Sequence, residues 1–161
     1  MGKYMYIAYG SNLHFEQMKF RCPNSIYMGS GYLKNAELLF RGTPGNCFCT
    51  VDLNKKGKKV PIGIFIVDDT DLINLDRYEG YPIHYRREMI KPKQMEIISW
   101  MNKGIKLVDS IIYIMNRGYY GAPSERYMQV VLEGYENCNL DKEYLDKAYR
   151  KSIKLGNAQF R

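Results

Sequence analysis

Strand-like runs follow one another through most of this sequence, and helices do not alternate with them. Each run is rich in Tyr and aliphatic residues, and turn-forming residues separate one run from the next. We expect strands at residues 3–9, 26–33, 36–41, 47–53, 60–67, 85–91, 95–100 and 106–115. A hairpin loop at residues 102–104 would join the last two strands. This order argues against a doubly wound parallel sheet, which needs a helix between successive strands.

Four helices are predicted, and each follows a residue type that caps helices. They cover about residues 13–20, 69–79, 125–137 and 142–155. The capping residues are Ser11 or Asn12, Asp69 or Thr70, Ser124, and Asp141. The predicted fold class is α+β: a small mixed β-barrel with flanking helices and a C-terminal helix pair, as one domain over residues 1–161.

Composition excludes several classes of protein. The chain has 161 residues and a net charge of +7, but its lysines are spread out and no RNA- or DNA-binding signature is present, so we expect no nucleic-acid partner. No signal peptide and no membrane-spanning run are recognisable, so we expect a cytoplasmic protein without a membrane partner. The four cysteines form no Cys-x-x-Cys pair, and neither histidine has a spaced partner, so the sequence predicts no metal site.

Glu79 is the most unusual charged residue of the predicted helices. It follows Leu72 at i+7 and Leu75 at i+4, so it shares their apolar stripe. It also precedes Gly80 at the helix C-terminus, where the helix dipole disfavours a negative charge. Both effects favour the protonated acid and predict a raised pKa, which is typical of a functional carboxylate. The alternative is a frayed helix end with the carboxylate in water.

The segment Tyr9-Gly10-Ser11-Asn12-Leu13 marks the point where the first strand turns into a helix. A turn of this kind points free main-chain N–H groups into the turn, where they can hold an anion. It lacks the lysine of a phosphate-binding loop, and Ser11 is not in a Gly-x-Ser-x-Gly elbow, so neither a nucleotide site nor a serine hydrolase is indicated. An ordinary strand-to-helix turn is the alternative, and the helical spacing of Tyr127 taken alone favours a core residue.

These residues, taken together and in this order, resemble the gamma-glutamylcyclotransferase family. The resemblance rests on the run from Tyr9 to Leu13, on Leu75-Asp76-Arg77-Tyr78-Glu79-Gly80, and on Pro123-Ser124-Glu125-Arg126-Tyr127. The two regions at residues 42–46 and 81–84 differ from the better-known members of the family that act on glutathione-related molecules. Those regions would shape the pocket for the leaving group, so the resemblance does not fix the substrate.

The resemblance implies a cofactor-independent enzyme that cyclises a gamma-glutamyl amide or peptide to 5-oxoproline and releases the amine. It implies that Glu79 is the catalytic acid/base and that a homodimer is one possible assembly. The residues implied to bind the small-molecule gamma-glutamyl substrate are Tyr6, Ile7, Ala8, Tyr9, Gly10, Ser11, Asn12 and Tyr127. A second hypothesis is a non-catalytic relative that binds a glutamyl-like metabolite or a peptide end in the same pocket.

Overall fold

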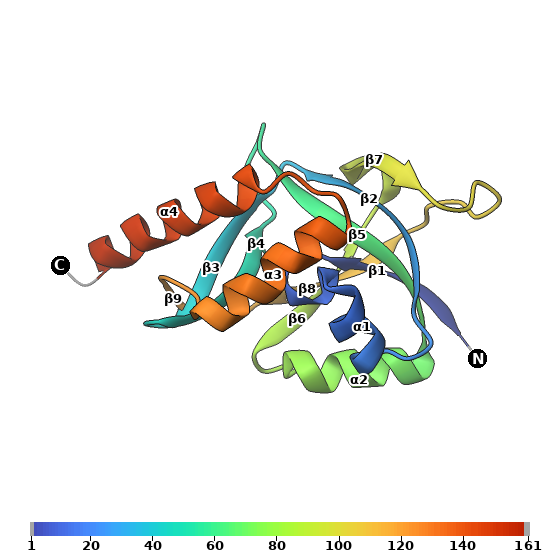
Figure 1. Ribbon diagram of the computed structural model, residues 1–161, viewed down its shortest axis with the longest axis horizontal. Helices are drawn as coiled ribbons and strands as arrows, with labels where there is room; N and C mark the ends of the chain where they lie inside the picture. The colour runs from blue at the N-terminus through green and yellow to red at the C-terminus, as the bar shows by residue number, and fades with distance from the viewer. Residues whose placement is uncertain (1, 160–161) are drawn as a thin grey trace.

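The computed structural model describes residues 2–159, which form two β-sheets and the helices around them (Figure 1). The first half contains β1 (Lys3–Ala8), the 3-10 helix η1 (Ser11–Leu13), α1 (Phe15–Arg21), β2 (Ile26–Lys34), β3 (Glu37–Thr43), β4 (Asn46–Asp52) and β5 (Lys59–Asp68). The second half contains α2 (Asp69–Glu79), β6 (Tyr85–Ile90), η2 (Pro92–Gln94), β7 (Met95–Trp100), β8 (Ser110–Met115), β9 (Tyr119–Tyr120), α3 (Glu125–Asn137) and α4 (Glu143–Gln159).

The larger sheet has six strands in the order β6-β8-β1-β5-β2-β7, and the smaller sheet has three in the order β4-β3-β9. In the larger sheet only β1 and β8 pair in parallel, so the α+β class is confirmed. Within residues 2–159 the edge strands β6 and β7 do not pair with each other, and closure into a barrel is not confirmed. The apolar patterns located the strands, but they did not specify which edges would meet.

The predicted hairpin between residues 95–100 and 106–115 is wrong. β7 pairs with β2 at the edge of the sheet, whereas β8 begins only at Ser110 and lies between β6 and β1. Burial explains the difference, because all six residues of β8 are buried, as expected of a strand covered on both faces. β7 exposes much of its surface and therefore suits an edge.

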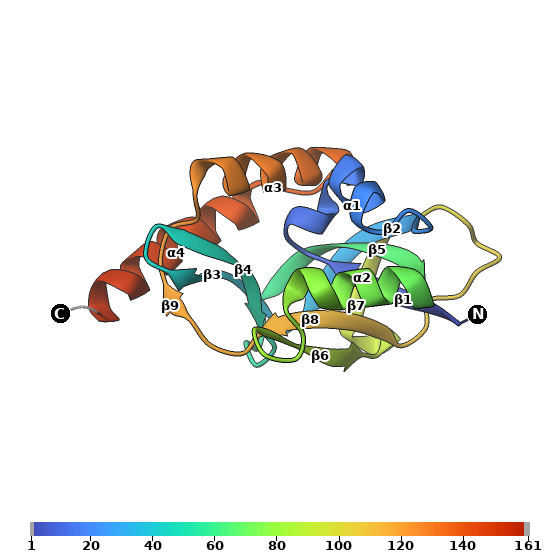
Figure 2. The ribbon, with the colours of Figure 1, turned by 90° about the horizontal axis from the view of Figure 1, so that it is seen from below.

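The helices gather around the two sheets in different places. Figures 1 and 2 show α4 alongside β3 at one end of the molecule, and α1 and α2 lie next to each other away from that end. α3 packs against η1 and so covers the turn that follows β1. The predicted C-terminal helix pair is confirmed, with Ser124 and Asp141 accepting hydrogen bonds from main-chain N–H groups at the starts of α3 and α4.

The first predicted helix is interrupted. Instead of a helix from residue 13 capped by Ser11 or Asn12, the chain forms η1 and then α1, whose cap is His14; its Nδ1 accepts a hydrogen bond from the Gln17 N–H at 3.2 Å. The amide of Asn12 donates instead to the hydroxyl of Tyr6 at 2.9 Å. This tertiary contact takes the capping side chain away from the helix.

α2 begins and ends where predicted, but its N-cap lies one residue before the earlier of the two predicted caps. Asp68, rather than Asp69 or Thr70, is the N-cap, and its side chain and that of Asp71 form a reciprocal capping box. Gly80 adopts a left-handed conformation with φ 65°, which favours glycine and stops the helix directly after Glu79. The position of Glu79 at the end of α2 is therefore set by local sequence.

Gly134 sets the distance between α3 and the turn after β1. A Cβ at this position would lie 2.7 Å from the main-chain nitrogen of His14 and 2.7 Å from Cβ of Leu13, so the backbones would have to separate. We expect Gly134→Ala to destabilise the fold by about 1–3 kcal/mol, although alanine favours helices. Denaturant unfolding measures this change. Gly104→Ala is the control, since its Cβ would meet only the Asn102 side chain, at 3.2 Å; equal stability of the two variants would contradict the prediction.

Candidate active site

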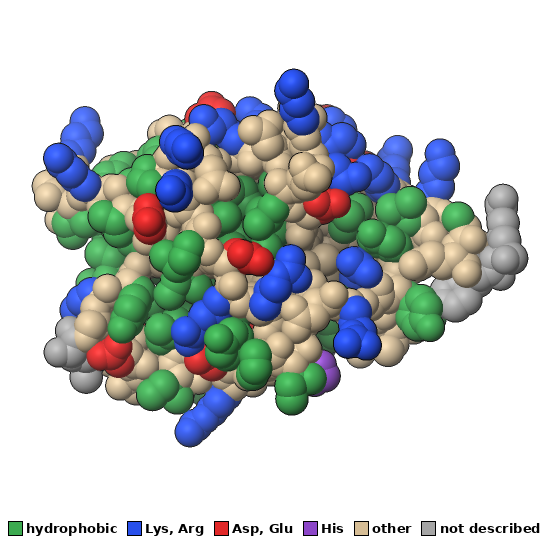
Figure 3. Space-filling view, turned by 180° about the vertical axis from the view of Figure 1, so that it is seen from behind, with side chains coloured by type: hydrophobic (Ala, Val, Ile, Leu, Met, Phe, Trp, Pro, Cys, Tyr) green, Lys and Arg blue, Asp and Glu red, His purple; other side chains and the backbone are tan. Residues whose placement is uncertain are grey.

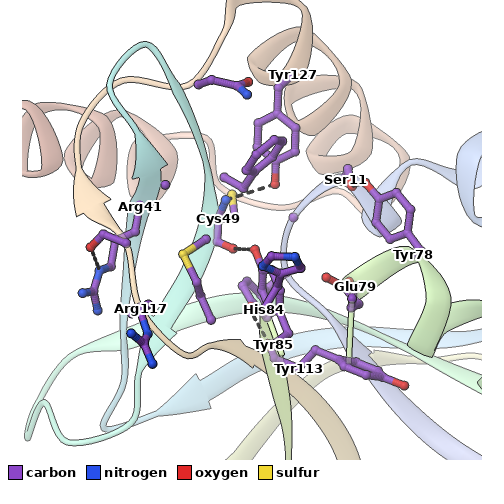
Figure 4. A pocket seen from close by; sticks show the side chains of 18 of the residues that line it. Ser11, Arg41, Cys49, Tyr78, Glu79, His84, Tyr85, Tyr113, Arg117 and Tyr127 are labelled. Atoms are coloured by element: carbon purple, nitrogen blue, oxygen red, sulfur yellow. Dashed lines mark hydrogen bonds between the residues drawn. The ribbon is translucent and has the colours of Figure 1, made fainter. Parts of the chain in front are cut away.

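A cavity of about 970 Å³ lies between the two sheets, where α2, η1 and α3 approach them (Figure 4). Seven of the nine residues predicted to form the site line it: Tyr6, Tyr9, Gly10, Ser11, Asn12, Glu79 and Tyr127. Ile7 and Ala8 do not line the cavity, because they are fully buried in β1, where they pair with Ile64 and Gly63 of β5. The structure thus brings together the distant segments that the sequence analysis selected.

Glu79 contributes the acidic group of this cavity. The buried side chains of Leu72 and Leu75 hold α2 in place, and the same helical stripe turns Glu79 toward the cavity, where it is half-buried. Burial raises the pKa of Glu79 from 4.5 to about 7, and the nearby Arg21 guanidinium opposes this shift. No hydrogen bond or ion pair within residues 2–159 engages its carboxylate, so the group can exchange protons with a bound molecule near neutral pH.

The turn after β1 provides hydrogen-bond donors from the main chain. The N–H groups of Gly10 and Ser11 donate to no main-chain or side-chain acceptor within residues 2–159, although both residues line the cavity. Gly10 also permits close packing, because a Cβ there would lie 2.9 Å from the hydroxyl oxygen of Tyr127 and 3.0 Å from Cβ of Cys49. Such unpaired N–H groups suit a carboxylate or a developing oxyanion.

Arg21, at the end of α1, joins this turn to the end of α2. Its Nη1 donates to Ser11 Oγ at 3.1 Å and to Asn12 Oδ1 at 2.5 Å. Its guanidinium carbon lies 3.2 Å from the centroid of the Tyr78 ring, and the Tyr78 hydroxyl is 3.2 Å from Ser11 Oγ. Because Tyr78 directly precedes Glu79, this cation–π and hydrogen-bond cluster fixes the carboxylate relative to the turn.

Removing the Arg21 charge is expected to move the pKa of Glu79 further upward. Arg21→Met eliminates the positive charge that opposes desolvation, so the carboxyl should titrate above about 7. Carbon-13 NMR titration of the glutamate carboxyl groups measures this value. Arg150→Met is the control, since Arg150 is 78% exposed on α4, and an unchanged or lowered pKa in Arg21→Met would contradict the assigned electrostatic effect.

Tyr127 forms part of the wall contributed by α3 and β4. Its hydroxyl oxygen accepts a hydrogen bond from the Cys49 N–H at 3.1 Å, and its ring meets Phe48 edge-to-face at a centroid distance of 5.0 Å. On the same strand, the Cys49 carbonyl accepts a hydrogen bond from the hydroxyl of Tyr85 at 3.2 Å. These contacts hold two cavity-lining tyrosines, Tyr127 and Tyr85, against the main chain of Cys49 in β4.

Several residues around the cavity were not predicted from the sequence. A network behind Glu79 links Asp76 of α2 to Arg87 and to the Tyr113 hydroxyl, which donates at 2.6 Å. His84, which the sequence analysis did not select, lines the cavity, as do Arg41 and Arg117 (Figure 4). These three residues come from segments distant in sequence, so no local pattern identifies them. The resemblance indicated this region only indirectly, by implying that residues 42–46 and 81–84 would shape the pocket.

In the described part of the chain, the cysteines and the other potential metal ligands form no second reactive or metal-binding site. All four cysteines are free and buried. Within residues 2–159, no group of three or more His, Cys, Asp and Glu side chains is placed to hold a metal ion. None of the helices between residues 2 and 159 combines the length and the apolar character needed to cross a membrane.

Comparison with known proteins yields one family and several structures. The family described as gamma-glutamyl cyclotransferase, AIG2-like, matches residues 6–136, a range that includes the turn, Glu79 and Tyr127. No curated protein matches the sequence.

The solved structures share the fold at low sequence identity. One is titled gamma-glutamyl cyclotransferase, with a TM-score of 0.74 and 23% identity over 94% of this chain and 88% of that chain. An uncharacterized protein from Homo sapiens has a TM-score of 0.75 and 22% identity over 95% of this chain and 89% of its own. An AIG2-like protein from Mus musculus has a TM-score of 0.57 and 17% identity over 72% of this chain and 79% of its own.

Proposed function

Because this chain belongs to the gamma-glutamyl cyclotransferase, AIG2-like family, we propose that it cyclises a gamma-glutamyl amide to 5-oxoproline and releases the amine. The α-amino nitrogen of the substrate attacks its own γ-carbonyl carbon, a five-membered ring closes, and the amide C–N bond breaks. One proton leaves the α-amine and one reaches the departing nitrogen. The reaction therefore consumes neither water nor a protein nucleophile, and it needs a group that can both accept and donate a proton.

The observation that carries this proposal is the state of Glu79. Its pKa of about 7 makes the carboxylate a base of suitable strength near neutral pH, and it lines the cavity beside the turn after β1. A base takes the proton from the attacking amine, and the resulting acid returns it to the leaving nitrogen. A pocket that only binds a metabolite does not need a carboxyl group that titrates near neutral pH, so the raised pKa of Glu79 favours the enzyme over the non-catalytic binding protein.

The turn supplies the positioning that the reaction requires. In the proposed complex, the N–H groups of Gly10 and Ser11 hold the α-carboxylate or the oxyanion of the glutamyl head, and Tyr127 closes the wall across from them. Folding the substrate for attack on itself can contribute roughly 7–11 kcal/mol to lowering the barrier. Proton transfer by Glu79 contributes the remaining chemical step.

The test is an assay of purified protein with a panel of gamma-glutamyl amides and peptides. Mass spectrometry should detect 5-oxoproline and the free amine in equal amounts for at least one panel member. The matched control is the N-acetyl form of the same substrate, which lacks the attacking amine and should remain intact. Recovery of every panel member unchanged after long incubation with saturating protein would instead support the binding protein.

Figure 3 does not make a case for nucleic-acid binding. On the face it shows, several Lys and Arg side chains lie along the upper edge, and elsewhere they stand among acidic and apolar ones. Binding to a phosphate backbone favours a continuous positive surface. We therefore base the proposed function on the cavity and not on the net charge of +7.

A further inference from the structure

The cavity extends well past the segments that would hold a glutamyl head. Its volume of about 970 Å³ is at the upper end of the range for small-molecule sites, and a glutamyl head fills only a small part of it. Beyond Cys49, the walls come from the β3–β4 hairpin, from residues 117–119 and from Gln159 at the end of α4. This second end, which we call the distal end, is where the amine half of a substrate would lie.

The distal end is positively charged. Arg41 and Arg117 lie there, on the side of the cavity away from Glu79 in Figure 4. Arg77 is the third arginine that lines the cavity, and Glu79 is the sole carboxylate among the described lining residues. Two guanidinium groups without an acidic neighbour in the wall repel each other, and an anion between them would remove this cost.

Arg41 is held so that part of its guanidinium remains available. Its Nε donates to the Gly118 carbonyl at 2.8 Å, and its guanidinium carbon lies 4.7 Å from the centroid of the Tyr120 ring. Its Nη atoms have no hydrogen-bond partner within residues 2–159. The side chain is thus oriented by two contacts while its terminal donors stay unpaired, which is the arrangement that binds a carboxylate or phosphate well.

Close packing places Arg117 next to this group. A Cβ on Gly118 would lie 2.9 Å from the main-chain nitrogen of Gly42, so the segment that carries Arg117 passes directly against β3 beside Arg41. The Arg117 side chain is exposed and has no hydrogen bond or ion pair within residues 2–159. Two independent segments therefore deliver guanidinium groups to one place.

We propose that Arg41 and Arg117 form a subsite for an anionic group on the amine half of the substrate, an inference that rests on the proposed cyclotransferase function. The substrate class is gamma-glutamyl amides whose departing amine carries a carboxylate or a phosphate at some distance from the scissile bond. Binding of this remote anion holds the amide carbonyl near Glu79 and the turn, so its binding energy supports the reaction. Neutral gamma-glutamyl amines lack that anchor.

The experiment uses substrates in matched pairs, and kcat/KM for 5-oxoproline release is measured for each. One pair is gamma-glutamyl-glycyl-glycine and its C-terminal amide; the other is gamma-glutamyl-ethanolamine phosphate and gamma-glutamyl-ethanolamine. We expect the anionic member to react about 10-fold faster or more in at least one pair, because a hydrogen bond to a charged group contributes roughly 1.5–3 kcal/mol. The pair with the larger ratio distinguishes a carboxylate from a phosphate.

Variants of Arg41 and Arg117 test whether these residues cause the preference for anionic substrates. Arg117→Met should reduce the ratio to near one by slowing only the anionic member, and Arg41→Met should do the same. Because Arg41 also holds the Gly118 carbonyl, Arg117→Met is the cleaner of the two. Arg150→Met, on the exposed face of α4, is the control and should leave the ratio unchanged. Equal rates within both pairs, or equal losses for neutral and anionic members, would overturn the proposal.

Calorimetric binding of the same pairs separates failure of this proposal from failure of the proposed function. If no substrate is turned over but the anionic members bind more tightly, and Arg117→Met abolishes that difference, the subsite stands and the proposed reaction fails. If turnover occurs without any preference for the anionic members, the reaction stands and the subsite fails. If neither binding nor turnover is detected for any pair, both are rejected.

Discussion

Glu79→Gln lowers 5-oxoproline formation by about 10²–10⁴-fold, the usual contribution of a positioned general acid/base. The amide is nearly the same size as the acid, so the cavity and the N–H groups of Gly10 and Ser11 are retained, but it cannot take the proton from the attacking amine. The loss should therefore appear in kcat, with KM for the gamma-glutamyl substrate changing much less. Steady-state kinetics on a substrate identified by the panel measures both quantities.

Glu96→Gln is the matched control for this substitution. Glu96 is exposed on β7 and does not line the cavity, so the same chemical change there should leave turnover intact. The pH profile gives a second readout. Because the base must be ionised, kcat/KM should rise with pH through an inflection near 7, the pKa of Glu79. Turnover of Glu79→Gln at the rate of the unmodified protein would show that another group moves the proton.

The same substitution should stabilise the fold at alkaline pH. The folded-state pKa of Glu79, about 7, is raised above its ordinary value of 4.5, so between these values the folded protein binds more protons than the unfolded chain. The contribution of this carboxyl group to the free energy of unfolding is therefore fully present below about pH 4.5 and is lost as pH rises through about 7. Taken at face value, the pKa shift corresponds to about 3 kcal/mol of unfolding free energy. The carboxylate is only half-buried and faces the cavity, so we expect a gain of about 2 kcal/mol for Glu79→Gln at pH 8.5.

Denaturant unfolding at two pH values tests this expectation. At pH 4 the acid is protonated in both states, so Glu79→Gln and the unmodified protein should have nearly equal free energies of unfolding. At pH 8.5 the variant should unfold at a higher denaturant concentration, and Glu96→Gln should not. A variant that is less stable than the unmodified protein at pH 8.5 would mean that the ionised carboxylate is well solvated or paired in the fold.

Local sequence accounted for those parts of the site that depend on neighbours along the chain. The spacing of Leu72, Leu75 and Glu79 predicted the side of α2 from which the carboxylate would project, and Gly80 predicted where the helix would end. Ser124 likewise predicted the start of α3, which positions Tyr127 at the third residue of that helix. Each of these features is decided within two helical turns.

Features that depend on pairing between distant segments were not predictable in this way. The apolar run of β8 is compatible with a hairpin to β7 or with a central place in the sheet, and only the packing of the whole domain decides between them. Arg21 contacts Ser11 and Tyr78 from another helix. Arg41 donates a hydrogen bond to the Gly118 carbonyl, in the segment that carries Arg117. The spacing of charged residues along the sequence does not predict these contacts.

The division of the cavity between two sheets has an evolutionary consequence. The proposed chemistry belongs to the larger sheet and α2, whereas Arg41, the oriented group of the distal end, belongs to β3 of the smaller sheet. Changes in the smaller sheet can then alter which molecules are accepted without disturbing the proton-transferring machinery. Proteins that descend from such a scaffold can change their substrate range by remodelling the β3–β4 hairpin alone. The main-chain N–H groups of the turn after β1 are retained, because no side-chain replacement removes them.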